Sequence, residues 1–353
     1  MKSLAFPIAI FLIADASAPV YGAQFCVHNS DELSTALATA STNGEDDNIK
    51  LAPGIYSPPG SLGFTFYSSD LHGLTIGGGF DTPTGGLPCS LPLGGAQSSV
   101  IDGAGITRLL DIALSGASAA PVFLHDLTLR NGSAIGSNPF MRLSRSVSSN
   151  GSILIENVAV RDVHAESAVA RVQTSGIILV RSSEFIGNTV DVPNGTVLDL
   201  ISDRPGSGGS IFFNNNTVAG NSVPASSPQA GVVFEGSTSG DVHAANNILW
   251  NNGGVDIRLG ESGTIYLDHN DIGSRNSGSA MVNESTPFHV DPKFVSAINV
   301  HLMSNSPLRD AGVASPIGGS GNTDLGGGAR VVFGGVDLGA YEIQDRIFMD
   351  GFE

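Results

Sequence analysis

The sequence predicts an all-β solenoid, and three observations support this prediction. A run of β-branched and aromatic residues followed by asparagines, such as GSIFFNNNTVAGNS at Gly209–Ser222, recurs along the middle of the chain. The recurrences lie 23 to 33 residues apart and keep one order of apolar and polar positions, which is typical of coils with loops of varying length. Because one such unit cannot bury its own apolar face, neighbouring units must stack.

Two apolar columns predict the inward face of a strand that occurs once in each coil. They are two residues apart, which is the spacing of side chains on one face of a strand. The first column contains Val122, Ile153, Ile178, Ile211, Val242 and Ile265, and the second contains Leu124, Ile155, Val180, Phe213, Ala244 and Leu267.

A polar column two residues further along predicts an asparagine ladder at a turn. Stacked Asn and Asp side chains can hydrogen-bond one another, and Asn tolerates the left-handed backbone of a turn. The predicted ladder consists of Asp126, Asn157, Ser182, Asn215 and Asn246.

The chain begins with a predicted signal peptide, residues 1–22. One basic residue, Lys2, precedes an apolar run from Leu4 to Ala14 that is too short to span a bilayer, and small residues follow it. No later apolar run is long enough for a transmembrane helix. We therefore expect an exported chain.

Residues 23–100 are expected to form an N-terminal cap and the first, irregular coils. Asn29 or Ser30 can cap a short helix that would cover the open end of the solenoid. Its apolar face would consist of Leu33, Ala36, Leu37 and Ala40. Cys26 and Cys89, the chain's two cysteines, are expected to form a structural disulfide, because the chain is exported and their spacing fits no zinc site.

The composition of the chain argues against some classes of binding partner. The formal net charge is −17, with Lys+Arg only 16. Binding to nucleic acid requires clustered Lys and Arg, so a nucleic-acid partner is not expected, and neither is docking on anionic lipid. The interpretation favoured is a soluble, self-repelling secreted monomer.

The repeats, predicted as regular coils over 101–290, resemble single-stranded right-handed parallel β-helix proteins of the pectate-lyase-like superfamily. Residues 291–344 contain DPKFVSAINVHLMSNSPLRDAG and DLGGGARVVFGGVDLGAYE, and they resemble the end of the bacterial choice-of-anchor Q family. That resemblance implies an exported β-helix protein of a Gram-negative bacterium whose variable C-terminus attaches or sorts it. The last residues, 345–353, resemble a short sorting tail.

The outward face of the predicted strand holds the binding candidates. Aromatic rings on a flat sheet can stack on sugar rings, and neighbouring acids and amides can bind hydroxyls. The candidates are Phe123, His125, Phe212, Asn214, His243 and Tyr266. The alternative interpretation is that this stripe packs beneath a long loop or the C-terminal segment, or mediates self-association.

Glu156 and Arg181 would be neighbours on successive coils. A β-helix polysaccharide lyase uses acids to hold calcium and an Arg or Lys as base, but a surface ion pair is the favoured interpretation here. Calcium is expected only in the lyase alternative, and no other cofactor or metal. Asp102 and Asp111 are interpreted as turn residues.

Taken together, the sequence favours a secreted or cell-surface binding and structural module without catalysis, either adhesin-like or glycan-binding. Its partners would be polysaccharide or other components of the cell envelope. The alternative is a polysaccharide lyase or hydrolase that acts on an acidic glycan.

Overall fold

The computed structural model describes residues 22–81, 89–116, 119–134, 138–146, 150–202, 209–224, 231–236, 240–260 and 263–344. The predicted signal peptide (except Gly22) and the tail at 345–353 lie outside this part of the chain. None of the helices in this part of the chain has the length and the apolar run that a membrane-spanning segment needs.

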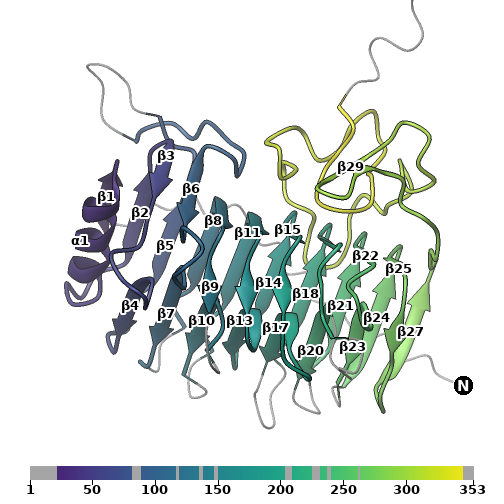
Figure 1. Ribbon diagram of the computed structural model, residues 1–353, viewed down its shortest axis with the longest axis horizontal. Helices are drawn as coiled ribbons and strands as arrows, with labels where there is room; N and C mark the ends of the chain where they lie inside the picture. The colour runs from purple at the N-terminus through teal and green to yellow at the C-terminus, as the bar shows by residue number, and fades with distance from the viewer. Residues whose placement is uncertain are drawn as a thin grey trace, which may run out of the picture.

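The molecule is a parallel β-helix, because each turn of the chain adds one strand to each of several parallel sheets (Figure 1). The first sheet runs the length of the molecule through β1 (Ala23–Val27), β2 (Asp47–Leu51), β5 (Leu74–Gly77), β8 (Val122–Arg130), β11 (Ile153–Arg161), β14 (Ile178–Arg181), β18 (Ile211–Asn214), β21 (Val242–Ala245), β24 (Thr264–Asp268) and β27 (Met281–Ser285). The all-β solenoid predicted from the repeats is thus confirmed.

The second sheet closes the other side of each coil. It consists of β4 (Phe64–Ser68), β7 (Leu110–Leu114), β10 (Met141–Arg145), β13 (Ala168–Thr174), β17 (Thr196–Ser202), β20 (Val232–Gly236), β23 (Ile257–Leu259) and β26 (Arg275–Asn276). Its neighbouring strands are likewise paired in parallel. Apolar side chains from both sheets meet in one continuous core.

Shorter strands complete the coils. β3 (Gly54–Tyr56), β6 (Ser99–Asp102), β15 (Glu184–Ile186), β19 (Thr217–Ala219), β22 (Ile248–Trp250) and β25 (Asp271–Ile272) branch from the first sheet. A third strip contains β9 (Ser133–Ala134), β12 (His164–Ala165) and β16 (Thr189–Val190), and β28 (Phe294–Ser296) pairs antiparallel with β29 (Asn299–Leu302).

Both predicted inward columns are buried. Ile153 and Ile178 are paired partners, as are Ile155 and Val180, and all four side chains are fully inaccessible. The alternation of side chains along a strand sends the residues between them to the outer face. The sequence register is therefore confirmed along the first sheet.

The N-terminal end is covered as predicted. Helix α1 (Ser30–Ala40) begins after the N-cap Asn29, whose side chain accepts a hydrogen bond from the Glu32 N–H. Its buried residues are Leu33, Ala36, Leu37 and Ala40. The predicted disulfide between Cys26 and Cys89 is present. The first coils stack in register with the later ones, since β1, β2 and β5 continue the first sheet.

The C-terminal region, residues 291–344, lies beside the coils (Figure 1). Its described strands, β28 and β29, form a sheet of their own and join no sheet of the solenoid. Its apolar side chains Leu325, Ala340 and Tyr341 form a second cluster with Ile186 and Ala219 on the outer face of β15 and β19. This cluster explains why residues that point away from the main core are nevertheless buried.

Candidate functional site

A row of aromatic side chains crosses the outer face of the first sheet near its C-terminal end. Phe212, His243 and Tyr266 are successive partners in the register of β18, β21 and β24. The ring centroids of Phe212 and His243 lie 5.5 Å apart with planes inclined at 14°, and those of His243 and Tyr266 lie 4.7 Å apart at 4°. The parallel strands thus hold three rings face to face.

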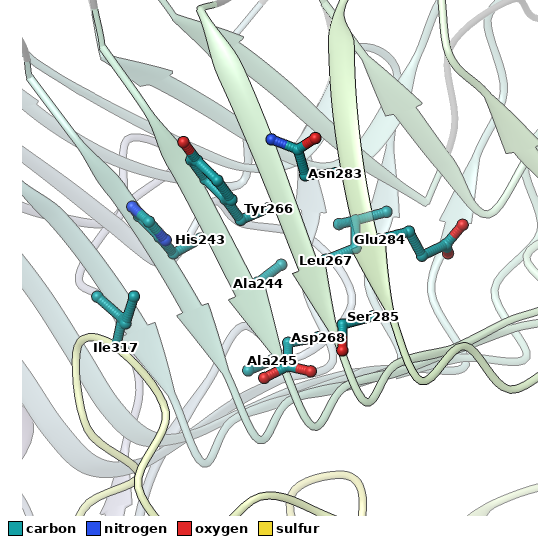
Figure 2. A pocket seen from close by; sticks show the side chains of 10 residues that line it. All are labelled: His243, Ala244, Ala245, Tyr266, Leu267, Asp268, Asn283, Glu284, Ser285 and Ile317. Carbon is teal, nitrogen blue, oxygen red and sulfur yellow. The ribbon is translucent and has the colours of Figure 1, made fainter. Parts of the chain in front are cut away.

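His243 and Tyr266 of this ring row line a pocket of about 480 Å³ (Figure 2). Tyr266 and His243 form one wall, and Ile317, from the C-terminal region, lies beyond His243. The polar lining residues are Asp268, Asn283, Glu284 and Ser285. Tyr266 is 38 % exposed, so a ligand can reach its ring.

The charges around the pocket are acidic. Burial lowers the pKa of His243, which favours the neutral imidazole at pH 7. Asp268 Oδ1 lies 2.8 Å from His269 Nδ1, and Glu284 accepts a hydrogen bond of 2.9 Å from Arg275. Carboxylates and an amide beside stacked neutral rings can bind hydroxyl groups, and they oppose a negatively charged ligand.

The predicted binding candidates do not form one site. Phe123 and His125 are on β8, and their rings lie 4.6 Å apart. Leu154 and Leu179 occupy the two register positions between Phe123 and Phe212. The stripe is therefore divided by aliphatic side chains, and of the six candidates only His243 and Tyr266 line the pocket.

The C-terminal region covers part of the predicted stripe. Asn214 is fully buried, and its Nδ2 donates to the carbonyls of Ile317 (2.8 Å) and Gly319 (2.9 Å). Gly318 passes over Phe212 so closely that a Cβ at this glycine would lie 2.8 Å from the phenyl group. The amide of Asn214 is consequently engaged within the protein, and Phe212 is half-buried.

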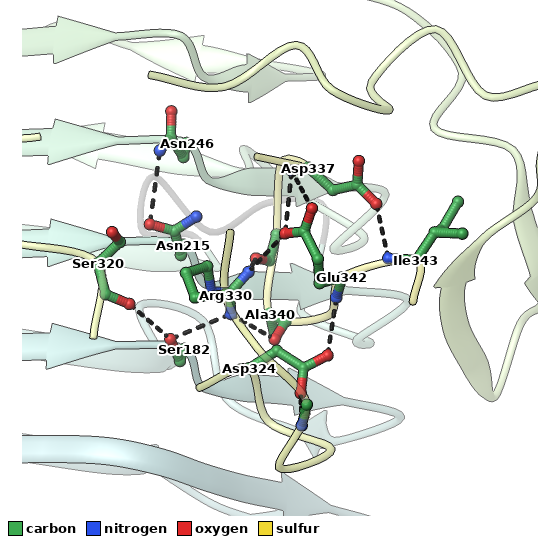
Figure 3. Close-up of polar contacts among 12 residues, drawn as sticks. Ser182, Asn215, Asn246, Ser320, Asp324, Arg330, Asp337, Ala340, Glu342 and Ile343 are labelled. Atoms are coloured by element: carbon green, nitrogen blue, oxygen red, sulfur yellow. Dashed lines mark hydrogen bonds and ion pairs between the residues drawn. The ribbon is translucent and has the colours of Figure 1, made fainter. Parts of the chain in front are cut away.

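Arg330 is the anchor of this covering segment (Figure 3). The side chain is fully buried and donates to Ser182 Oγ (3.1 Å), the Ala340 carbonyl (2.7 Å) and the Gly339 carbonyl (3.2 Å). Ser182 in turn donates to the Ser320 carbonyl at 3.1 Å. One guanidinium thus joins the C-terminal segment to a turn of the coils.

Glu156 and Arg181 form the expected ion pair. They are register partners on β11 and β14, and Arg181 Nη2 donates to Glu156 Oε2 at 2.9 Å. Gly321 lies directly over the pair, since a Cβ there would come within 2.7 Å of Glu156 Oε1. Both side chains are therefore partly covered, which leaves little room for a substrate on them.

The predicted asparagine column has the left-handed backbone expected of it. All five residues have φ between 50° and 59°. Asn157 donates to Asp126 at 3.1 Å and Asn246 to Asn215 at 3.5 Å, whereas Ser182 and Asn246 also bond to the C-terminal segment. The C-terminal segment therefore packs against the coils largely along this column.

A more regular ladder lies one residue further along the chain, and sequence reasoning missed it. Asn216, Asn247 and Asn270 are buried, and each amide oxygen accepts from the preceding coil. A second buried series contains Asn188, Asn221 and Asn252 and ends at Asp256. The first ladder could have been found in the sequence by aligning, from repeat to repeat, the residue that follows each residue of the predicted asparagine column.

One group of acids in the described residues comes close enough to share a cation. Asp310, Asp337 and Glu342 each offer an oxygen within 4.8 Å of the others. However, both Asp337 oxygens accept backbone N–H groups, from Asp310 and Ile343, and both Glu342 oxygens accept the N–H of Asp337. These bonds give the acids a structural role in folding the C-terminal region.

Asp111 corrects one interpretation made from the sequence. It lies within strand β7 and not in a turn, and it is only 2 % exposed. Its carboxylate accepts hydrogen bonds from Tyr67 and from two arginines. The sequence repeats that were aligned cover only the first-sheet strand of each coil. The position of Asp111 on the second sheet therefore could not be predicted from them.

Comparison with known proteins adds no assignment to this geometry. No protein-family model matches the chain, and no curated protein is similar enough in sequence to match it. The class of protein is therefore defined by the fold alone, as a parallel β-helix.

Proposed function

We propose that this chain is an exported or cell-surface β-helix protein that binds carbohydrate without catalysing a reaction. The observation that carries the proposal is the stacked pair of His243 and Tyr266 beside the pocket. Flat neutral rings match the apolar face of a sugar, and the carboxylate of Asp268 and the amide of Asn283, which line the pocket, can bond to its hydroxyls. The acids favour a neutral glycan over a uronate.

Export is part of the same proposal. It rests on the apolar leader expected at residues 1–22, on the Cys26–Cys89 disulfide, which suits an oxidising compartment, and on the resemblance of the C-terminal region to the choice-of-anchor Q family. On the surface of a Gram-negative cell, glycans of the cell envelope would be the ligands within reach of the ring row.

Titration calorimetry with neutral oligosaccharides tests the site. We expect Tyr266→Ala and His243→Ala each to weaken binding at least tenfold, because stacking on an aromatic ring is lost. Phe333→Ala, which removes a ring that is 67 % exposed elsewhere on the surface, should bind as the parent does. Unchanged affinity in both site variants would reject the proposal.

The lyase alternative has its own assay. The protein is incubated with uronate polysaccharides with and without calcium, and the absorbance of the unsaturated product is followed. We expect no product, because Arg181 is paired with Glu156 beneath Gly321. Calcium-dependent product formation that Arg181→Ala abolishes would replace the binding proposal with a lyase.

A further inference from the structure

A row of four charged side chains crosses the outer face of the second sheet, on the opposite side of the coils from the ring row. Asp111, Arg142, Arg171 and Asp199 are consecutive partners in the register of β7, β10, β13 and β17. The order along the row is therefore acid, arginine, arginine, acid.

Each arginine bonds to the acid on its own end of the row. Arg142 donates from Nε and Nη2 to the two Asp111 oxygens, at 2.7 and 3.0 Å. Arg171 donates from Nε to Asp199 Oδ2 at 2.8 Å. Arg142 and Arg171 are direct register partners, so no acid separates the two residues in the row.

This arrangement places two residues of like charge directly opposite each other in the register. Neighbouring strands of a sheet lie about 4.8 Å apart, and like charges directly opposite each other destabilise the pairing. The Arg142 and Arg171 side chains are 34 % and 37 % exposed, whereas those of Asp111 and Asp199 are only 3 % and 7 % exposed. A ligand can thus reach the arginines while the acids hold them in place.

Unused donors remain at the middle of the row. In the described part of the chain, Arg171 donates to Asp199 from Nε alone and neither of its Nη groups makes a hydrogen bond, whereas Arg142 donates to Asp111 from Nε and Nη2 and also interacts with Tyr67. Guanidinium groups bind oxyanions through paired, charge-assisted hydrogen bonds. Two held guanidiniums on adjacent strands therefore present a prearranged receptor for one oxyanion.

We propose that Arg142 and Arg171 form a binding site for a single carboxylate or sulfate group on an otherwise neutral ligand. Asp111 and Asp199 flank the site at a spacing of one strand, so they repel a second negative charge at that distance. The whole chain, with its net charge of −17, opposes a polyanion as well. The site thus selects isolated oxyanions and discriminates against polymers that carry a charge on every unit.

The test compares four probes by calorimetry at low salt. One is an oligosaccharide in which a uronate alternates with a neutral N-acetylated sugar, and a second is its carboxyl-reduced counterpart. The others are a neutral oligosaccharide with one sulfate ester and a homopolymer of uronate. We expect the alternating or the sulfated probe to bind at least tenfold more tightly than both the reduced probe and the homopolymer, and the stronger of the two identifies the oxyanion.

Variants assign this binding to the arginine pair. Arg142→Lys and Arg171→Lys should each weaken it at least fivefold, since the charge stays but the forked geometry is lost. Arg171→Gln with Asp199→Asn removes both charges and keeps a hydrogen-bonding pair, so loss of binding in this double variant cannot be attributed to an unpaired buried acid. Arg130→Gln is the matched control, because Arg130 is also a strand arginine bonded to an aspartate, Asp102, but lies on the first sheet.

Two results would overturn the inference. One is equal affinity for charged and carboxyl-reduced probes, and the other is oxyanion binding that survives both the Arg171→Lys substitution and the double variant. Tyr266→Ala separates the two proposals, because it should weaken binding of neutral glycans at least tenfold and leave oxyanion binding unchanged.

Discussion

The side-chain oxygen of Asn247 accepts two hydrogen bonds from Asn216, one from the backbone N–H (2.9 Å) and one from Nδ2 (3.1 Å). Asn247 makes the same pair of bonds to Asn270 on the next coil. Each asparagine therefore satisfies a backbone donor of its predecessor, and the coils are joined by side chains as well as by their sheets.

Loss of one ladder member should be costly. Asn247→Ala leaves the buried Asn216 backbone N–H without its acceptor, and it also removes the bonds of Asn247 to Asn216 Nδ2 (3.1 Å) and to the Phe213 carbonyl (2.6 Å). We expect the free energy of unfolding to fall by about 3 kcal/mol, since each buried unpaired group costs on the order of 1–3 kcal/mol. Urea denaturation measures this. The exposed Asn283→Ala should change stability by less than about 0.5 kcal/mol.

The docked C-terminal segment should loosen when its anchor is removed. Arg330→Met deletes the bonds to Ser182, Gly339 and Ala340 and leaves Glu342 without the guanidinium 3.7 Å away. Breaking a buried pair costs on the order of 3–5 kcal/mol. Hydrogen exchange should accelerate in residues 311–342 but not in α1. Uniform acceleration along the chain would contradict a local anchor.

The disulfide should stabilise the N-terminal cap. It joins residues 63 positions apart, and closing a loop of that length stabilises a fold by about 4 kcal/mol in the chain-entropy model. Cys26→Ser with Cys89→Ser should therefore unfold at a markedly lower urea concentration than the parent. Adding a reductant should shift the parent to the midpoint of the variant and leave the variant unaffected.

Asp271 should make stability depend on pH. Burial raises its pKa from 3.8 to about 6, so between these values the folded state binds more protons than the unfolded state. The contribution of this group is fully present below pH 3.8 and is lost as the pH rises through about 6, at a cost of about 3 kcal/mol. Asp271→Asn should flatten the fall in stability between pH 4 and pH 7.

Part of that fall should persist in the variant. The pKa of Asp47 is also raised to about 6, chiefly by burial, and it acts in the same direction. The measurement is urea denaturation at each pH. If the free energy of unfolding of Asp271→Asn depends on pH as that of the parent does, Asp271 does not titrate in this range.

The proposed glycan and oxyanion sites differ in how far they could be predicted from the sequence. The ring row could be predicted, because Phe212, His243 and Tyr266 hold the same position in three recognisable repeats. The arginine pair could not, since the segments around Arg142 and Arg171 share no asparagine signal, and loops of unequal length separate them from the repeats that can be registered.

The sequence by itself determined the solenoid, the faces of the first-sheet strands, the capping helix and the cysteine pair. These features follow from short-range rules: the two-residue alternation of a strand, the helical spacing of α1 and the repeat of one unit. Local patterns of this kind can be recognised in a sequence, because residues that are close along the chain determine whether a given side chain is buried or exposed.

Only the tertiary structure decided which outward residues remain accessible. The C-terminal region returns over the coils, buries Asn214 and covers Phe212, Glu156 and Arg181, while Tyr266 stays open. That outcome depends on contacts such as Arg330 with Ser182, which are 148 residues apart. No periodicity records such a contact, because its free energy comes from two segments that meet only after each has folded.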